Sequence, residues 1–255
     1  MMVFLTGLCL AVAAGLVGVP LVLKKQAMLG DGLSHVSIMA VAIALAFGWA
    51  PVEFALPVVI LVSVLLLKLD ERGKSGGDTG VAVAAASSLA VGVLIAEFAE
   101  LDAELEGYLF GEITEIGGFE TTLAVLLAAS AVFVFLCFRE EIFALTFDEK
   151  FAKAIGVKTE RYNILFAILS SVVVVLGMRI AGALLISSLL VFPVLTARQV
   201  AKSFRATVLG AAAIAVLNFL GGFVISQVLA LPIGATVVVF SLAILTIFKL
   251  ISLAK

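Results

Sequence analysis

The sequence predicts an all-α protein, a bundle of about nine membrane-spanning helices. Of its 255 residues, 64% are hydrophobic and 13% are charged, whereas soluble domains carry about 45–50% apolar and about 25% charged residues. The mean hydropathy of +1.30 agrees. The apolar residues also fall into stretches of about 20, the length that crosses a bilayer. This composition excludes an ordinary soluble enzyme, a disordered chain and a coiled coil.

The first predicted span covers residues 2–23, which are apolar from the beginning. Its basic residues, Lys24 and Lys25, follow the apolar stretch. A cleaved signal peptide has the opposite order, with its positive charges first. We therefore expect a retained transmembrane helix at this position.

The remaining spans are separated by short polar segments, and proline and glycine occur within several of them. Neighbouring helices can satisfy the backbone groups that proline leaves free, and small residues allow close helix packing. We therefore expect residues 1–255 to form a single transmembrane domain, with eight to ten spans possible. The expected spans after the first are 33–49, 51–67, 79–98, 121–138, 163–178, 180–197, 206–229 and 235–253.

The distribution of lysine and arginine predicts the orientation. Basic residues cluster in alternate loops, most clearly in 68–74, 139–161 and 198–205, whereas the loop 97–120 carries only acidic residues. Basic loops lie on the cytoplasmic side, so the N-terminus is predicted to lie outside and the C-terminus inside. Arg179 is the one exception, in a predicted tight turn between two spans.

Several functional classes are excluded by missing residues or motifs. The chain has one histidine, so it cannot supply the two histidines of a zinc protease helix. It contains neither a phosphate-binding G-x-x-x-x-G-K-[ST] loop nor a G-x-S-x-G nucleophile motif. A net charge of −2 provides no field for nucleic acid. We expect no enzymatic activity, no bound cofactor and no nucleic-acid partner.

A polar cluster begins the second span, Gly30-Asp31-Gly32-Leu33-Ser34-His35. Asp31 and His35 are four residues apart, so on a helix they share one face. A carboxylate with an imidazole suits a borderline divalent cation such as zinc or manganese. The alternative is that Asp31 caps the helix and His35 hydrogen-bonds to it. Burying two ionisable groups in a membrane without a function is costly, which favours the metal site.

A second feature lies in the basic segment 146–158, which is predicted to form a short cytoplasmic helix. Acidic residues at its beginning suit the helix dipole, and Gly156 suits its end. Its apolar residues recur at helical spacing, with lysines on the opposite face. Such a helix can lie on lipid headgroups or dock a soluble partner, and the pattern leaves both open. The apolar stripe consists of Phe147, Phe151, Ala154 and Ile155.

These two features resemble the membrane subunits of ATP-binding-cassette (ABC) importers for zinc and manganese, and for iron in some members. The G-D-x-L-S-H signature of that family is matched by 30–35, and its coupling helix resembles 148–157. The resemblance extends over about residues 15–240. Where members often place a glycine after the histidine, this chain has Ile38-Met39-Ala40. Further similar stretches are Tyr108-Leu109-Phe110-Gly111, Gly182 to Ser187 through Pro193 to Ala197, and Leu231-Pro232-Ile233-Gly234.

The resemblance implies the permease of an ATP-driven importer in a prokaryotic inner (plasma) membrane. It implies a homodimer surrounded by lipid, a separate cytoplasmic ATPase and an extracytoplasmic metal-binding protein. By position, Asp31 and His35 would contact the passing cation. The residues expected to couple to the ATPase are Asp148, Glu149, Phe151, Ala152 and Gly156. The alternatives are an ABC permease for siderophores or cobalamin, which needs no Asp/His pair, and a secondary carrier, which needs no ATPase.

Overall fold

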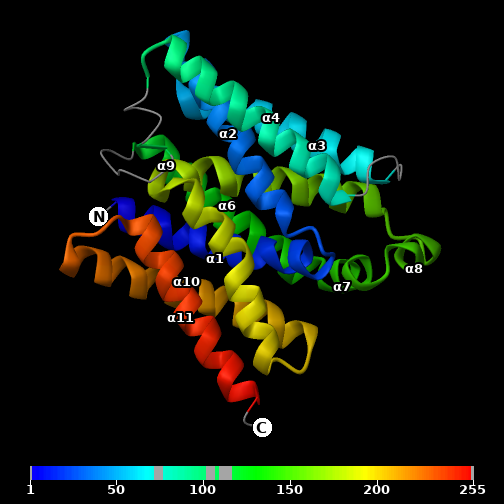
Figure 1. The fold of residues 1–255 in the computed structure, drawn as a ribbon. Coiled ribbons are helices and arrows are strands. Elements are labelled where there is room, and N and C mark those ends of the chain that lie inside the picture. Colours follow the sequence, from blue (N-terminus) through cyan, green and yellow to red (C-terminus); the bar gives the residue numbers. More distant parts are fainter. Residues whose placement is uncertain (1, 72–76, 102–106, 109–116, 254–255) are drawn as a thin grey trace.

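The computed structural model describes residues 2–71, 77–101, 107–108 and 117–253 (Figure 1). All regular secondary structure in these residues is helical, which confirms the predicted all-α class. The helices are α1 (Met2–Leu23), α2 (Met28–Ala46), α3 (Pro51–Glu71), α4 (Gly77–Phe98), α6 (Gly118–Cys137), α7 (Arg139–Phe147), α8 (Glu149–Ala154), α9 (Thr159–Val200), α10 (Phe204–Leu229) and α11 (Ile233–Leu253).

Eight of the described helical segments are long and apolar enough to cross a membrane. They are α1, α2, α3, α4, α6, the part of α9 up to Arg179, α10 and α11. Large apolar side chains such as Leu136 and Val228 are exposed on them, as expected for contact with lipid. The second span begins at Met28 rather than at residue 33, because the segment with Asp31 and His35 is itself helical.

The predicted sixth and seventh spans, 163–178 and 180–197, belong to one helix of 42 residues. The expected tight turn at Arg179 is therefore wrong. Instead α9 bends at Gly182, whose φ is +80°, a left-handed backbone conformation that glycine adopts without steric cost. Figure 1 shows the change of direction between the two parts of α9. The part after the bend contains a shorter apolar segment, Leu185–Val200.

Both ends of α9 lie at the same end of the bundle. Near the beginning of α9, Asn163 accepts a hydrogen bond from Lys24 at the end of α1. Just after α9, the Phe204 ring packs on Phe147 of α7 with centroids 6.2 Å apart. Because α7 and α8 are consecutive and in contact, the segment after Gly182 must run back to the end where α9 began. The predicted seventh span is thus a returning segment, although no loop precedes it.

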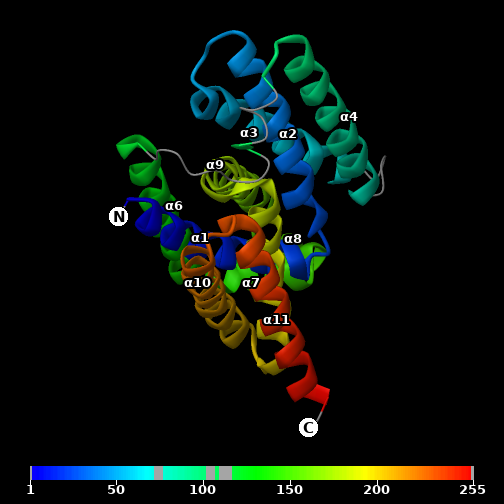
Figure 2. The same cartoon turned by 60° about the vertical axis from the view of Figure 1, so that its left-hand side comes forward.

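The helices form two groups that meet at α9. Helices α2, α3 and α4 contact one another on one side, and α10 and α11 contact each other on the opposite side. Figures 1 and 2 show α1 and α9 between these groups. The result is that α2, with Asp31 and His35, packs directly on the bent helix α9.

Glycine permits the closest approaches between these helices. Gly18 of α1 lies against the carbonyl of Leu190 in α9, where a Cβ atom would clash. Gly92 of α4 lies against the backbone of Met39, in the stretch of α2 where family members often carry a glycine. Gly92 therefore permits the close approach of α2 and α4.

Candidate functional site

Asp31 and His35 lie on successive turns at the beginning of α2. The Oδ2 atom of Asp31 is 3.8 Å from Nε2 of His35, close enough for one cation to contact both. The Asp31 side chain is 47% exposed and that of His35 26%. The sequence prediction that the two groups share one helical face is confirmed.

The capping alternative for Asp31 is wrong. The N-cap of α2 is Ala27, no side chain caps the helix, and Asp31 is the fourth helical residue. Its Oδ1 atom instead accepts a hydrogen bond from the hydroxyl of Ser187 in α9, at 3.1 Å. Sequence analysis did not assign Ser187 to the site. The sequence signal that could have indicated Ser187 is its place in the Gly182-to-Ser187 stretch, which begins with the glycine at which α9 bends.

The Asp31 carboxylate and the His35 imidazole can each donate a ligand atom to a metal ion. The Nδ1 atom of His35 is buried and has no hydrogen-bond partner within the described residues. No group of three or more His, Cys, Asp or Glu side chains forms a metal cluster in the described part of the chain. Since zinc in stable sites takes four ligands, these two donors provide only part of a coordination shell. Such a site suits a cation that must leave again.

Helix α8 has the ends that its sequence predicts. Asp148 is its N-cap, and its carboxylate accepts a hydrogen bond from the Phe151 amide at 2.9 Å. Gly156 ends the helix with a φ of +90°. The amides of Gly156 and Val157 donate to the carbonyls of Lys153 and Ala152, the pattern of a Schellman cap.

One face of α8 and its flanking residues is exposed and apolar, whereas the opposite face packs against the protein. The apolar side chains of Phe147, Phe151 and Ile155 are exposed, Phe151 by 57%. Ala152 is fully buried against the protein, and the partly buried Glu149 is one helical turn away. The predicted amphipathic helix is present, with its large apolar residues available to a surface outside this chain.

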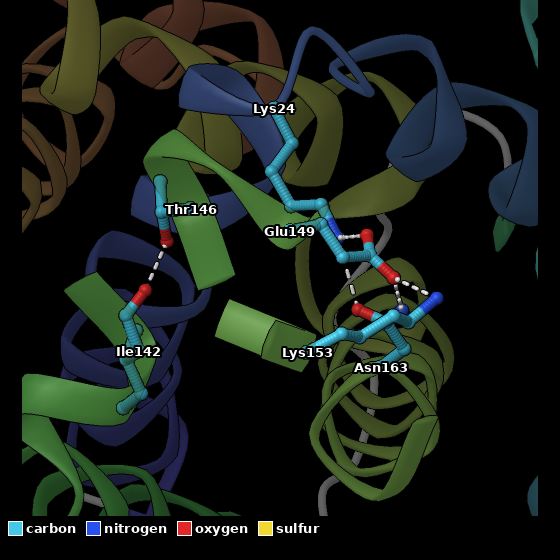
Figure 3. A network of polar contacts seen from close by, with 6 residues as sticks. All are labelled: Lys24, Ile142, Thr146, Glu149, Lys153 and Asn163. Carbon is cyan, nitrogen blue, oxygen red and sulfur yellow. Dashed lines mark hydrogen bonds and ion pairs between the residues drawn. The ribbon is translucent and has the colours of Figure 1, made fainter. Parts of the chain in front are cut away.

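Glu149 joins α8 to two other helices (Figure 3). Its Oε2 atom accepts a hydrogen bond from Nζ of Lys24, which directly follows α1, at 3.1 Å. Its Oε1 atom accepts one from Nδ2 of Asn163 in α9 at 3.2 Å and lies 3.2 Å from Nζ of Lys153. Lys24 also donates to Oδ1 of Asn163 at 2.9 Å. The sequence signals for this network were a lysine that ends one span and an asparagine within another.

The charges around Glu149 determine its titration. Burial by itself would raise the pKa of this carboxyl, but Lys24 and Lys153 together hold its pKa below the ordinary glutamate value. Glu149 is therefore ionised at neutral pH.

The segment between α6 and α8, predicted only as part of a basic loop, forms the additional helix α7. The rings of Phe143 and Phe147 on this helix contact Phe204 at the beginning of α10, with centroids 5.4 and 6.2 Å away. This aromatic cluster connects α7 to the end of the returning segment of α9. Two glutamates in its first turn were the sequence signal for the helix.

At the opposite end of the bundle, Arg179 pairs with Glu120 of α6 at 3.3 Å. The pair explains why a basic residue occurs where the loop pattern predicts none. Tyr108 lies near both, and burial raises the pKa of its phenol. The other residues of that similar stretch, 109–111, lie outside the described residues. The Leu231-to-Gly234 stretch connects α10 to α11, which begins at Ile233.

Comparisons with known proteins agree with this architecture. The model of the ABC 3 transport family matches residues 1–253. The chain is 26% identical over 248 residues to the high-affinity zinc uptake system membrane protein ZnuB of Haemophilus influenzae, covering 96% of this chain and 95% of that protein. It is 26% identical to the manganese import system permease protein ScaB of Streptococcus gordonii, covering 93% of this chain and 85% of that protein.

The fold is also similar to a solved structure, PsaBC from Streptococcus pneumoniae in complex with Fab. The TM-score is 0.83 at 23% sequence identity, with 96% of this chain and 89% of that chain covered. This likeness confirms the fold, and the relatives named above are transport subunits rather than enzymes. Since the family model spans almost the whole sequence, the chain belongs to the ABC 3 transport family.

Proposed function

We propose that this chain is the transmembrane permease of an ABC importer for a divalent transition-metal ion, zinc, manganese or iron. The observation that carries the proposal is the Asp31–His35 pair, partly exposed within an apolar bundle. The names of relatives as zinc and manganese permeases support the same substrate class.

The chemistry of the pair fits transient passage. A carboxylate and an imidazole together suit zinc, manganese and iron(II). Two protein ligands bind more weakly than a full tetrahedral set, and weak binding allows release into the cytoplasm. Water or a second copy of the permease would complete the coordination shell, so the working unit is a homodimer with both pairs near one path.

The ATPase binds on α8. Phe151 of this helix and the flanking Phe147 and Ile155 are exposed to a partner, and exposed aromatic residues are typical anchors of an interface. Family membership implies a separate ATPase and a solute-binding protein. The metal-binding protein delivers its cation at the opposite end, where Arg179 pairs with Glu120.

The N-terminus of the permease lies outside and its C-terminus inside. The contact between Lys24 and Glu149 brings the end of α1 to the α8 end, which agrees with the basic residues of both segments facing the cytoplasm. ATP hydrolysis in the partner moves α8 and thereby opens the path to one side at a time.

The two alternative functions are distinguished by the same residues. A siderophore or cobalamin permease shares the ATPase but does not need Asp31 or His35. A secondary carrier needs no ATPase, and membership of an ABC transport family argues against it.

The test is uptake of radiolabelled zinc, manganese and iron into vesicles that contain the permease with its ATPase and binding protein. In Asp31→Asn the Ser187 hydroxyl can still donate to the side-chain oxygen, so the structural contact remains and the charge is lost. We expect Asp31→Asn and His35→Ala to abolish uptake. Ser37→Ala is the control, because Ser37 is buried in the same helix but, two residues after His35, does not share its face. Uptake at the parental rate in both variants would contradict the proposal.

A further inference from the structure

A network of three side chains ties α8 to the end of α1. Lys24 directly follows α1, Glu149 lies in α8 and Asn163 in α9, and each contacts the other two. Figure 3 shows Lys24 and Asn163 converging on the Glu149 carboxylate. The residues are 14 to 139 positions apart in sequence, so only the folded chain brings them together.

This network is shielded from water. The Lys24 side chain is 13% exposed and that of Glu149 26%, and Asn163 is buried. Shielded, hydrogen-bonded ion pairs hold their geometry better than surface pairs, which are weakened by water and salt. Movement of α8 is therefore expected to displace the end of α1.

The end of α1 is rigidly connected to α2. Lys25 has a φ of +63°. Its amide donates to Val22, and the Gln26 amide donates to Leu21, which together form a Schellman cap without glycine. The Leu29 amide then donates to the Gln26 carbonyl. Because these hydrogen bonds run from α1 through Gln26 to Leu29, we expect Lys24 and the first turn of α2 to move together.

The other side of this turn has free space. A cavity of about 220 Å³ separates the turn from α3 and α4. The turn is thus bonded to α8 through Lys24 on one side and borders this cavity on the other, so part of its surface is not closely packed against described residues. Its far wall consists of Leu66 and Leu67 of α3 and of Asp78 and Val81 of α4.

We propose that Lys24 is the positioning residue through which α8 moves the Asp31–His35 pair. The inference rests on the proposed function and extends it, since it assigns the physical link between ATPase docking and the cation site. Asp31 lies seven residues after Lys24, in the first turn of α2. Pulling the Glu149 carboxylate moves Lys24, the turn and the beginning of α2, and this changes the position of Asp31 relative to Ser187 in α9.

Lys153 provides a matched comparison. Its Nζ atom is as close to Glu149 as that of Lys24, at 3.2 Å against 3.1 Å. However, Lys153 lies within α8 itself, four residues after Glu149, and its side chain is 55% exposed. It can stabilise the helix, but it cannot transmit movement to α1.

The experiment uses the permease with its ATPase and binding protein in vesicles and measures metal transported per ATP hydrolysed. We expect Lys24→Met to lower this ratio about tenfold, the effect of losing a hydrogen bond to a charged group. Lys153→Met should leave the ratio unchanged. The amount of ATPase bound and the melting temperature of the complex are measured for each variant, since a merely structural role would lower these without changing the ratio.

The exchange variant Lys24→Glu/Glu149→Lys keeps the test decisive if Lys24→Met assembles poorly. The Asn163 amide can turn over, so that its oxygen accepts from the new lysine and its NH₂ donates to the new glutamate. Recovery of the ratio in the exchange variant, above that of Lys24→Met, supports the link. An unchanged ratio in Lys24→Met, an equal loss in Lys153→Met, or no recovery in the exchange variant overturns it. Parental vesicles that transport none of the three metals contradict the proposed function, and this inference with it.

Discussion

The hydroxyl of Ser187 donates a hydrogen bond to the carboxylate of Asp31 across 3.1 Å, joining α2 to the segment of α9 that follows the Gly182 bend. One carboxylate oxygen is thereby fixed, and the other faces His35. The bend in α9 and the direction of the Asp31 side chain are therefore parts of one arrangement.

This bond predicts the effect of Ser187→Ala. Loss of the donor leaves the Asp31 side chain with more rotational freedom, so we expect the metal concentration for half-maximal uptake to rise about threefold with little change in the maximal rate. Uptake kinetics in vesicles measure both values. Ser188→Ala is the control, because the Ser188 hydroxyl donates to the Leu185 carbonyl of its own helix. Equal kinetics in the two variants would show that Ser187 does not position Asp31.

The bend itself predicts the effect of Gly182→Ala. An alanine at a φ of +80° is strained, by roughly 1–2 kcal/mol, so we expect a lower melting temperature in detergent and reduced uptake. Gly118→Ala is the matched control, because its backbone is helical and no atom of the described residues, apart from its neighbours along the chain, lies within 4 Å of where its Cβ would stand. A melting temperature equal to that of Gly118→Ala would mean that α9 does not need the left-handed residue.

The depressed pKa of Glu149 predicts a pH dependence of stability. Because its pKa is lower in the folded chain, the carboxylate stabilises the fold at pH values above the ordinary glutamate value of 4.5. This contribution is lost as the pH falls through the lowered folded-state pKa. Glu149→Gln should therefore be less stable than the parent at neutral pH, with the difference shrinking in acid. Melting temperatures of both proteins over the pH range test this, and a difference that is constant with pH would be inconsistent with it.

The exposed face of α8 predicts the effect of Phe151→Ala. An aromatic anchor at an interface contributes about 2 kcal/mol or more, so we expect the affinity for the ATPase to fall at least about tenfold while the permease keeps its melting temperature. Phe98→Ala is the control, since Phe98 is also exposed but ends α4. The affinity of each variant is measured with the purified ATPase. Equal affinities of Phe151→Ala and Phe98→Ala would contradict the docking role of α8.

The orientation predicts which residues are labelled from outside the cell. In a background with Cys9 and Cys137 replaced, Ala50→Cys should react with an impermeant thiol reagent, because the proposed orientation places the α2–α3 connection outside. Lys202→Cys should react only after the cells are opened, because it lies between α9 and α10 on the basic side. Labelling of Lys202→Cys in intact cells would contradict the proposed orientation.

The fold class, the ends of most spans and the α8 helix could be predicted from the sequence. These features depend on local properties, namely the length of an apolar stretch, the acidic N-cap Asp148 and the glycine that ends α8. The bend in α9 could not be predicted from the sequence, because a hydropathy pattern does not distinguish a turn at Arg179 from a left-handed residue at Gly182. The tight turn predicted at Arg179 is wrong because this charge lies within α9 and pairs with Glu120 of another helix, a partner that the local pattern does not indicate.

The candidate site was predictable only in part, for a similar reason. Asp31 and His35 are four residues apart, so helical geometry alone places them together. Ser187 is 156 residues from Asp31, and Lys24 is 125 from Glu149. Contacts at such separations depend on which helices pack together and on how those helices are shifted along their axes. A local pattern in one sequence does not show either.

The central claim, that the Asp31–His35 pair contacts the metal in transit, can be measured directly by electron spin-echo spectroscopy of Mn²⁺ bound to the transporter in vesicles. The permease has one histidine, so any imidazole nitrogen that it contributes to the metal belongs to His35. We expect a nitrogen modulation in the parental complex that disappears in His35→Ala, and a loss of bound Mn²⁺ in Asp31→Asn. A spectrum that is identical in the parent and in His35→Ala, from complexes that transport manganese, would contradict the account.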